Sequence, residues 1–174
     1  MEKKIMNKKS ILSNKNLHRI LKFLVLFNIF AIPLYVIIFS GIEWYSLKKF
    51  TSNIVFASLQ LTGMNPEIDG LLISIPIKDG KWAANIDWDC VGWKSMIAFF
   101  ALVMATDFSK RKKLFGMLFI PVIYFINILR IWFMFLYVRI YDLTYYNIIH
   151  AIVWGWGLII IVLILWVLWM KYIK

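Results

Sequence analysis

The sequence predicts an all-α integral membrane protein with about four transmembrane helices. Of its 174 residues, 62% are hydrophobic and 17% are charged, whereas a soluble domain is typically about 45–50% apolar and about 25% charged. Four apolar stretches are long enough to cross a hydrocarbon core of about 30 Å, which takes roughly 20 helical residues. Between the first two stretches, the chain predicts an extracytoplasmic amphipathic helix and a short β-hairpin.

The N-terminal part consists of a basic segment, residues 1–19, and the first apolar stretch, residues 20–41. The stretch exceeds the apolar core of about 7–15 residues that a cleaved signal peptide carries. No clear small-x-small cleavage site follows it. We therefore expect it to remain as a membrane anchor.

The other predicted spans are residues 91–106, 114–138 and 148–170, which with Cys90 form a three-helix core over residues 90–174. The second span is the shortest, and Lys94 near its start is expected to extend toward the lipid–water interface.

Charge sets the predicted orientation. Thirteen of the 20 Lys and Arg residues lie in segments 1–22, 110–113 and 171–174, whereas the segments on the other side hold six basic and seven acidic residues. The positive-inside rule therefore places both termini in the cytoplasm and residues 42–89 outside. The net charge of +11 is then explained mostly by the orientation of the chain in the membrane. We therefore expect no nucleic-acid partner.

The extracytoplasmic region begins with residues 43–61, which mix aromatic, basic and apolar positions and suit an amphipathic helix on the bilayer surface. Two β-prone runs follow, residues 71–77 and 82–86, with an Asp-Gly pair between them that indicates a hairpin turn. Pro76 in the first run favours an edge strand, because proline donates no hydrogen bond. The hairpin would deliver the chain to the start of the second span.

Arg130 is the clearest polar residue inside a predicted span. It lies about 12 Å below the outer end of the third span at ~1.5 Å per residue, and an ionisable group there costs about 2.5–3.5 kcal/mol. Asn127, three residues earlier on the same face, could orient the guanidinium. The alternative is a structural arginine that binds backbone carbonyl groups.

Cys90 is the one cysteine of the chain, so it forms no intramolecular disulfide, and with two histidines it makes no standard zinc site. Its place at the start of a span predicts a reactive thiol, because a helix N-terminus stabilises the thiolate. Lys94 acts in the same direction, whereas Asp89, as a helix cap, would oppose it. The alternative is an inert packed cysteine.

His150 lies at the outer end of the fourth span. Taken alone, such a histidine is more often an interface residue hydrogen-bonded to a neighbour. The predicted orientation, however, places Cys90, Arg130 and His150 on the same side of the membrane. Together they supply a nucleophile, a general acid/base and a fixed cation, which is a usable set for acyl transfer.

The chain resembles the exosortase/archaeosortase family of integral membrane transpeptidases at these positions. Cys90, Gly92 and Ser95 look like the family's C-x-G-x-x-S element, and Asn127 with Arg130 looks like its N-x-x-R element; His150 stands at the head of the last span. The chain departs from the family in size, since many relatives have more spans.

The resemblance implies a cysteine enzyme that needs no metal or organic cofactor. Cys90 would be the nucleophile, His150 the general acid/base and Arg130 the electrostatic stabiliser, with Asn127, Gly92, Ser95 and Asp89 in support. The implied partners are secreted proteins that carry a C-terminal motif, a transmembrane helix and a basic tail. The acyl acceptor would be an amine or a hydroxyl, with a lipid head group as one candidate. The enzyme would lie in the cell membrane, with its site toward the extracytoplasmic face.

Two other functions are open from the sequence. One is an intramembrane protease that hydrolyses the tail without transfer, and the other is a non-enzymatic membrane assembly subunit whose Arg130 pairs with a partner's acid. Trp82, Trp88 and Trp93 are either substrate contacts or members of an interfacial aromatic belt.

Overall fold

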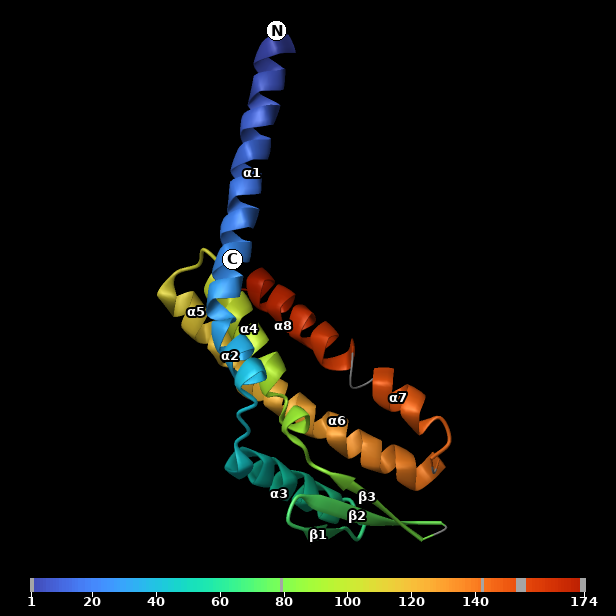
Figure 1. Cartoon of the computed structure of the whole chain (residues 1–174). Coiled ribbons are helices and arrows are strands. Elements are labelled where there is room, and N and C mark those ends of the chain that lie inside the picture. The colour runs from blue at the N-terminus through green and yellow to red at the C-terminus, as the bar shows by residue number, and fades with distance from the viewer. Residues whose placement is uncertain (1, 79, 142, 153–155, 173–174) are drawn as a thin grey trace.

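The computed structural model describes residues 2–78, 80–141, 143–152 and 156–172. Within these residues the protein is mostly helical, with a small antiparallel sheet at the end of the molecule away from the N-terminus (Figure 1). The elements in chain order are α1 (Glu2–Phe30), α2 (Ile32–Ser40), α3 (Tyr45–Leu61), β1 (Glu67–Asp69), β2 (Leu72–Ile77), β3 (Gly80–Asn85), the 3-10 helix η1 (Trp88–Val91), α4 (Trp93–Ala105), α5 (Lys110–Met117), α6 (Phe119–Tyr141), α7 (Tyr146–Ile152) and α8 (Leu158–Tyr172).

The first predicted span, residues 20–41, overlaps one long apolar stretch, Asn16–Ser40, which α1 and α2 form together. Pro33 lies in the first turn of α2, where its missing N–H removes no helical hydrogen bond. The chain stays helical across the junction, since the Ala31 N–H donates to the Phe27 carbonyl at 2.9 Å. α1 packs against α4. The stretch has the length and composition of a membrane span.

The predicted hairpin is confirmed and belongs to a sheet of order β1-β2-β3. The third strand, β1, was not expected because its three residues are too short for an alternating pattern. The prediction that Pro76 lies on an edge strand is wrong, since β2 is the middle strand. β1 pairs only with residues 72–74 of β2, so Pro76 lies beyond its reach and needs no donor toward it. Asp79 of the predicted turn lies outside the described residues.

The predicted amphipathic helix is confirmed as α3, and its apolar face packs on protein. Val55 and Leu59 are fully buried and share a hydrophobic cluster with residues of the sheet and with Ile128 and Phe135 of α6. A hydrogen bond of 3.1 Å joins the Thr51 hydroxyl to that of Tyr124 on α6. α3 and the sheet therefore pack together on α6. Contact of α3 with a bilayer surface stays a prediction.

The remaining predicted spans correspond to α4, to α5 with α6, and to α7 with α8. Among the described residues, Asn16–Ser40 and Lys110–Tyr141 are long and apolar enough to cross a membrane, whereas α4 and α8 are apolar but have 13 and 15 residues. Residues 153–155, which fall within the predicted fourth span, lie outside the described residues. The count of four spans therefore stays a prediction.

The apolar helices expose apolar side chains on their outward faces, as lipid contact requires. α8 exposes about half of the Ile160 and Ile164 side chains, and α2 exposes Val36. The inward faces of α4, α6 and α8 meet in a second hydrophobic cluster, which contains Phe99 and Trp169. An apolar outer face on a packed helical core is consistent with a membrane protein.

Candidate active site

Cys90 lies in η1, the short turn that joins the sheet to α4. The Asp87 carboxylate caps this turn by accepting a hydrogen bond of 2.7 Å from the Trp88 N–H, and the Cys90 N–H donates to the Asp87 carbonyl at 2.9 Å. The next residue, Val91, is fully buried, which anchors the turn in the core. Cys90 is thus held on a fixed turn ahead of α4.

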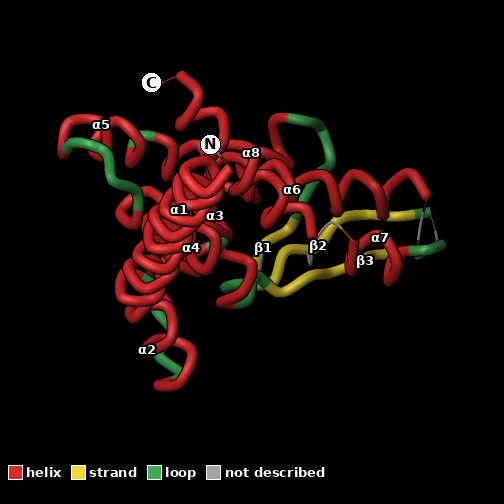
Figure 2. Tube along the Cα trace, turned by 90° about the horizontal axis from the view of Figure 1, so that it is seen from above, coloured by secondary structure: helices red, strands yellow, loops and turns green. Residues whose placement is uncertain are grey.

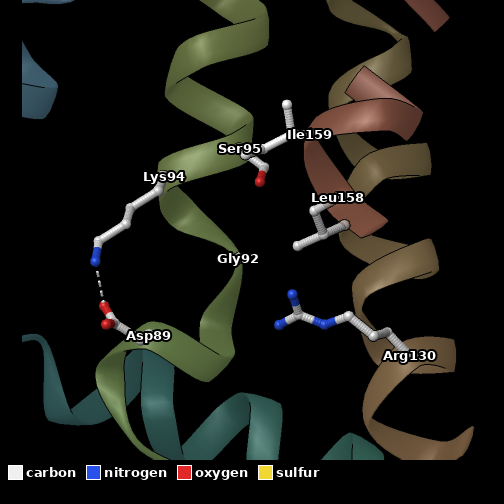
Figure 3. Close-up of a pocket in the computed structure, with 7 residues that line it drawn as sticks. All are labelled: Asp89, Gly92, Lys94, Ser95, Arg130, Leu158 and Ile159. Atoms are coloured by element: carbon white, nitrogen blue, oxygen red, sulfur yellow. Dashed lines mark ion pairs between the residues drawn. The ribbon is translucent and has the colours of Figure 1, made fainter. Parts of the chain in front are cut away.

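The expectation that Asp89 caps the following helix is wrong. Asp89 lies inside η1, and its carboxylate forms an ion pair of 2.7 Å with Lys94, as Figure 3 shows. α4 starts after Gly92 and has no side-chain cap. The reason is the left-handed conformation of Gly92, which separates η1 from α4 and moves Asp89 away from the α4 N-terminus. The opposing charges of Asp89 and Lys94 therefore act next to each other.

Gly92 and Asn127 interlock between this turn and α6. Gly92 has φ +78°, and a Cβ atom built on it would lie 2.8 Å from Asn127 Cγ, which is too close for any side chain. Asn127 is fully buried, and its Nδ2 donates a hydrogen bond of 2.8 Å to the Cys90 carbonyl. We expected this amide to orient Arg130; it binds the backbone of Cys90 instead. The two sequence motifs are therefore in direct contact.

Arg130 follows one turn later on α6, with 8% of its surface exposed. Its guanidinium points toward Gly92, on the η1–α4 side of the helix (Figure 3). It lines a cavity of about 250 Å³ together with residues of η1, α4 and α8, among them Asp89, Ser95 and Leu158. We call this the arginine cavity.

His150 lies on α7 and lines a second cavity, of about 80 Å³, together with Cys90. We call this the cysteine cavity. Tyr146, one turn before His150, stacks on it with ring centroids 5.5 Å apart, and Trp82 of β3 meets Tyr146 edge to face at 5.6 Å. Figure 2 shows α6, α7 and the sheet on the same side of the molecule. Aromatic contacts thus join α7 to the sheet.

The electrostatic environment keeps Cys90 protonated at rest. Burial raises the pKa of the Cys90 thiol, and the nearby charges of Asp87 and Asp89 raise it further. The hydrogen bond at Asp87 and the positive charge of Arg130 lower the pKa but do not offset burial. The charge of Arg130 also acts on His150. Cys90 therefore requires a proton acceptor before it can attack, and it shares its cavity with a histidine.

A model of the transmembrane exosortase family matches residues 11–170, nearly the whole chain. The chain belongs to this family. The match includes each predicted site residue, from Asp89 to His150. No curated protein and no solved structure matches the chain.

The exosortase site brings together some of the predicted tryptophan contacts and not others. Trp82 lines the cysteine cavity. Trp88 and Trp93 are 7% and 5% exposed and stack on each other at 5.3 Å inside a hydrophobic cluster, so they belong to the core. Sequence reasoning missed Tyr146, although its position four residues before His150 placed both on one helical face.

Proposed function

We propose that this exosortase is a membrane-embedded cysteine transpeptidase. The observation that supports the proposal is the grouping of three residues from distant segments. Cys90 and His150 line one cavity, and the charge of Arg130 acts on both of them. A nucleophile, a base and a fixed cation at one place are the parts that acyl transfer needs.

In the first step, His150 takes the proton from the Cys90 thiol, and the sulfur attacks the carbonyl carbon of the scissile peptide bond. A C–S bond forms and the carbonyl oxygen becomes negatively charged. Arg130 stabilises this charge, since a buried cation acts strongly where water is scarce. The C–N bond then breaks, and the departing amine takes the proton from His150. The product is a thioester on Cys90.

In the second step, an amine or hydroxyl of the acceptor attacks the thioester, and His150 accepts its proton. The new C–N or C–O bond forms as the C–S bond breaks, and the proton returns to the Cys90 sulfur. With water as acceptor, the same sequence gives hydrolysis. The two functions share the acyl-enzyme and differ only in the second nucleophile.

The proposed substrates are secreted proteins that end in a recognition motif, one transmembrane helix and a basic tail. Such a tail is already confined to the membrane plane, so meeting the enzyme costs less translational entropy than it does in solution. The distribution of basic residues supports a site toward the extracytoplasmic face with both termini inside. A lipid amine or hydroxyl is the proposed acceptor.

The test compares the surface proteins of two host strains, one with the native enzyme and one with the Cys90→Ala variant. Intact mass and C-terminal peptide mapping report the C-terminus of each surface protein. We expect a set of proteins to keep its helix and basic tail only in the variant. The mass added at the new C-terminus in the native strain identifies the acceptor, and addition of water alone indicates a protease. Ser46→Ala, an exposed change on α3, is the control. Unchanged C-termini would contradict an enzyme and favour an assembly subunit that uses Arg130.

A further inference from the structure

The cysteine cavity differs from the arginine cavity in size and in lining. The arginine cavity measures about 250 Å³ and contains the ion pair of Asp89 and Lys94. The cysteine cavity measures about 80 Å³, and among the described residues no Asp, Glu, Lys or Arg lines it. A group held beside Cys90 would therefore meet mainly apolar walls.

The walls of the cysteine cavity are fixed on two sides. Ile131, Met134 and Phe135 form its α6 side and are each no more than 3% exposed. From the sheet, Trp82 packs edge to face on Phe135, with ring centroids 5.2 Å apart, and also on Tyr146. These ring contacts hold Trp82, Phe135 and Tyr146 against one another, which limits how far the cavity can widen.

The volume restricts what can enter. A cavity of about 150 Å³ with apolar walls holds benzene, so a cavity of about 80 Å³ holds a side chain well below the size of an aromatic ring. The walls exclude charge as well, because transfer of an ion into apolar surroundings is strongly unfavourable unless a partner pairs with it. A small, neutral side chain fits both conditions.

We propose that the cysteine cavity is the subsite for the substrate side chain next to the scissile bond, that it admits compact uncharged side chains, and that Trp82 and Tyr146 set the size limit. The inference rests on the proposed function, because it assigns a substrate group to the space beside the nucleophile. It adds a selectivity that the three reacting residues do not provide by themselves.

The first experiment measures the size limit without a substrate. Cys90 is the chain's one cysteine, so alkylation of the full-length protein in detergent micelles, followed by intact mass, reports this thiol alone. Iodoacetamide serves as the compact reagent and N-benzyl iodoacetamide as the bulky one. The ratio of their rate constants at one pH cancels any change in thiol ionisation, because both reagents attack the same thiolate.

We expect Trp82→Ala to raise the relative rate of the benzyl reagent by about tenfold or more, a discrimination that hydrophobic pockets typically provide. Tyr146→Ala should act in the same direction. It provides a second test if Trp82→Ala fails to fold, because α7 has no buried residue among those described and should tolerate the change. Ala84→Val, which adds two methyl groups to the lining, should lower the ratio. Trp44→Ala, an exposed tryptophan outside this lining, is the matched control.

An unchanged ratio in both enlarged variants would overturn the subsite. The second arm uses a tail-bearing protein identified by the Cys90→Ala comparison, with the residue before its cleavage site changed to Ala, Val, Phe or Lys. Wild type should process the Ala and Val forms, and Trp82→Ala should gain the Phe form. Equal processing of all four forms by wild type would also overturn the inference. Because alkylation needs no substrate, failure of the subsite and failure of transpeptidation are separately visible.

Discussion

The two sides of the site are built differently. On the nucleophile side, the turn that holds Cys90 is anchored by the buried Trp88 and Val91, and the fully buried Asn127 binds the Cys90 carbonyl. On the histidine side, α7 has no buried residue among those described, and ring contacts from Tyr146 to Trp82 connect it to the sheet. The thiol is therefore positioned by the core of the protein, whereas aromatic contacts at the edge of the protein position the helix that carries the histidine.

The largest effect should come from removing either reacting group. Cys90→Ala should abolish tail removal, and Cys90→Ser should be nearly inactive because a serine hydroxyl is far less acidic. His150→Ala should lose a comparable factor, about 10³-fold or more, since residues that act as a unit lose activity together. Product formation by mass spectrometry measures this. If the losses of Cys90→Ser and His150→Ala multiplied in the double variant, the two residues would act independently and not as a unit.

Arg130→Lys tests whether the cation between the two sides works by shape as well as by charge. An ammonium does not reproduce the planar donor fork of a guanidinium, so we expect a loss of about 10²-fold, similar to removal of an oxyanion donor. Arg139→Lys, on the same helix and bonded to the Gly63 carbonyl, is the matched control. Full activity of Arg130→Lys in the same product assay would remove the oxyanion role.

Gly92→Ala tests how firmly the core holds the nucleophile side. The left-handed backbone alone costs about 1–3 kcal/mol for a residue with a side chain, and the contact with Asn127 adds to it. Gly63→Ala is the control, because Gly63 has φ +68° and no atom of the described residues lies within 4 Å of its Cβ position. We expect thermal unfolding in micelles at a clearly lower temperature for Gly92→Ala. Equal shifts would mean that the interlock is loose.

Tyr146→Leu tests the histidine side. The stacked pair with His150 contributes about 0.5–1.5 kcal/mol, so product formation should fall by up to about tenfold, the equivalent of ~1.4 kcal/mol. The unfolding temperature should stay close to that of wild type, because Tyr146 is only partly buried. A large fall in unfolding temperature would show that α7 is held as firmly as η1.

The smallest expected effect concerns the pH dependence of Cys90 alkylation. Because burial raises the pKa of the thiol, its reaction with iodoacetamide should keep accelerating at a pH where an ordinary cysteine, with a pKa of about 8.5, levels off. Asp89→Asn removes a negative charge that raises this pKa, so alkylation at pH 8 should become a few times faster. Asp69→Asn on β1 is the control. A slower Asp89→Asn protein would reverse the assigned sign.

The sequence predicted those features that depend on local patterns. The apolar stretches, the amphipathic helix and the hairpin follow from composition and alternation over neighbouring residues. The contact of Asn127 with Cys90 spans 37 positions and depends on how α6 meets η1, which no local pattern encodes. Tyr146 was missed because aromatic residues are common near membrane interfaces, so its type alone gave no signal.

The fit of Gly92 against Asn127 also bears on how this chain can change over generations. A side chain at position 92 has no room while the amide occupies position 127, and loss of the amide leaves the Cys90 carbonyl without its bond to α6. Neither position can vary freely before the other. Two segments that lie far apart in the chain are therefore expected to be inherited as one unit, and to be transplanted together when the site is engineered into another scaffold.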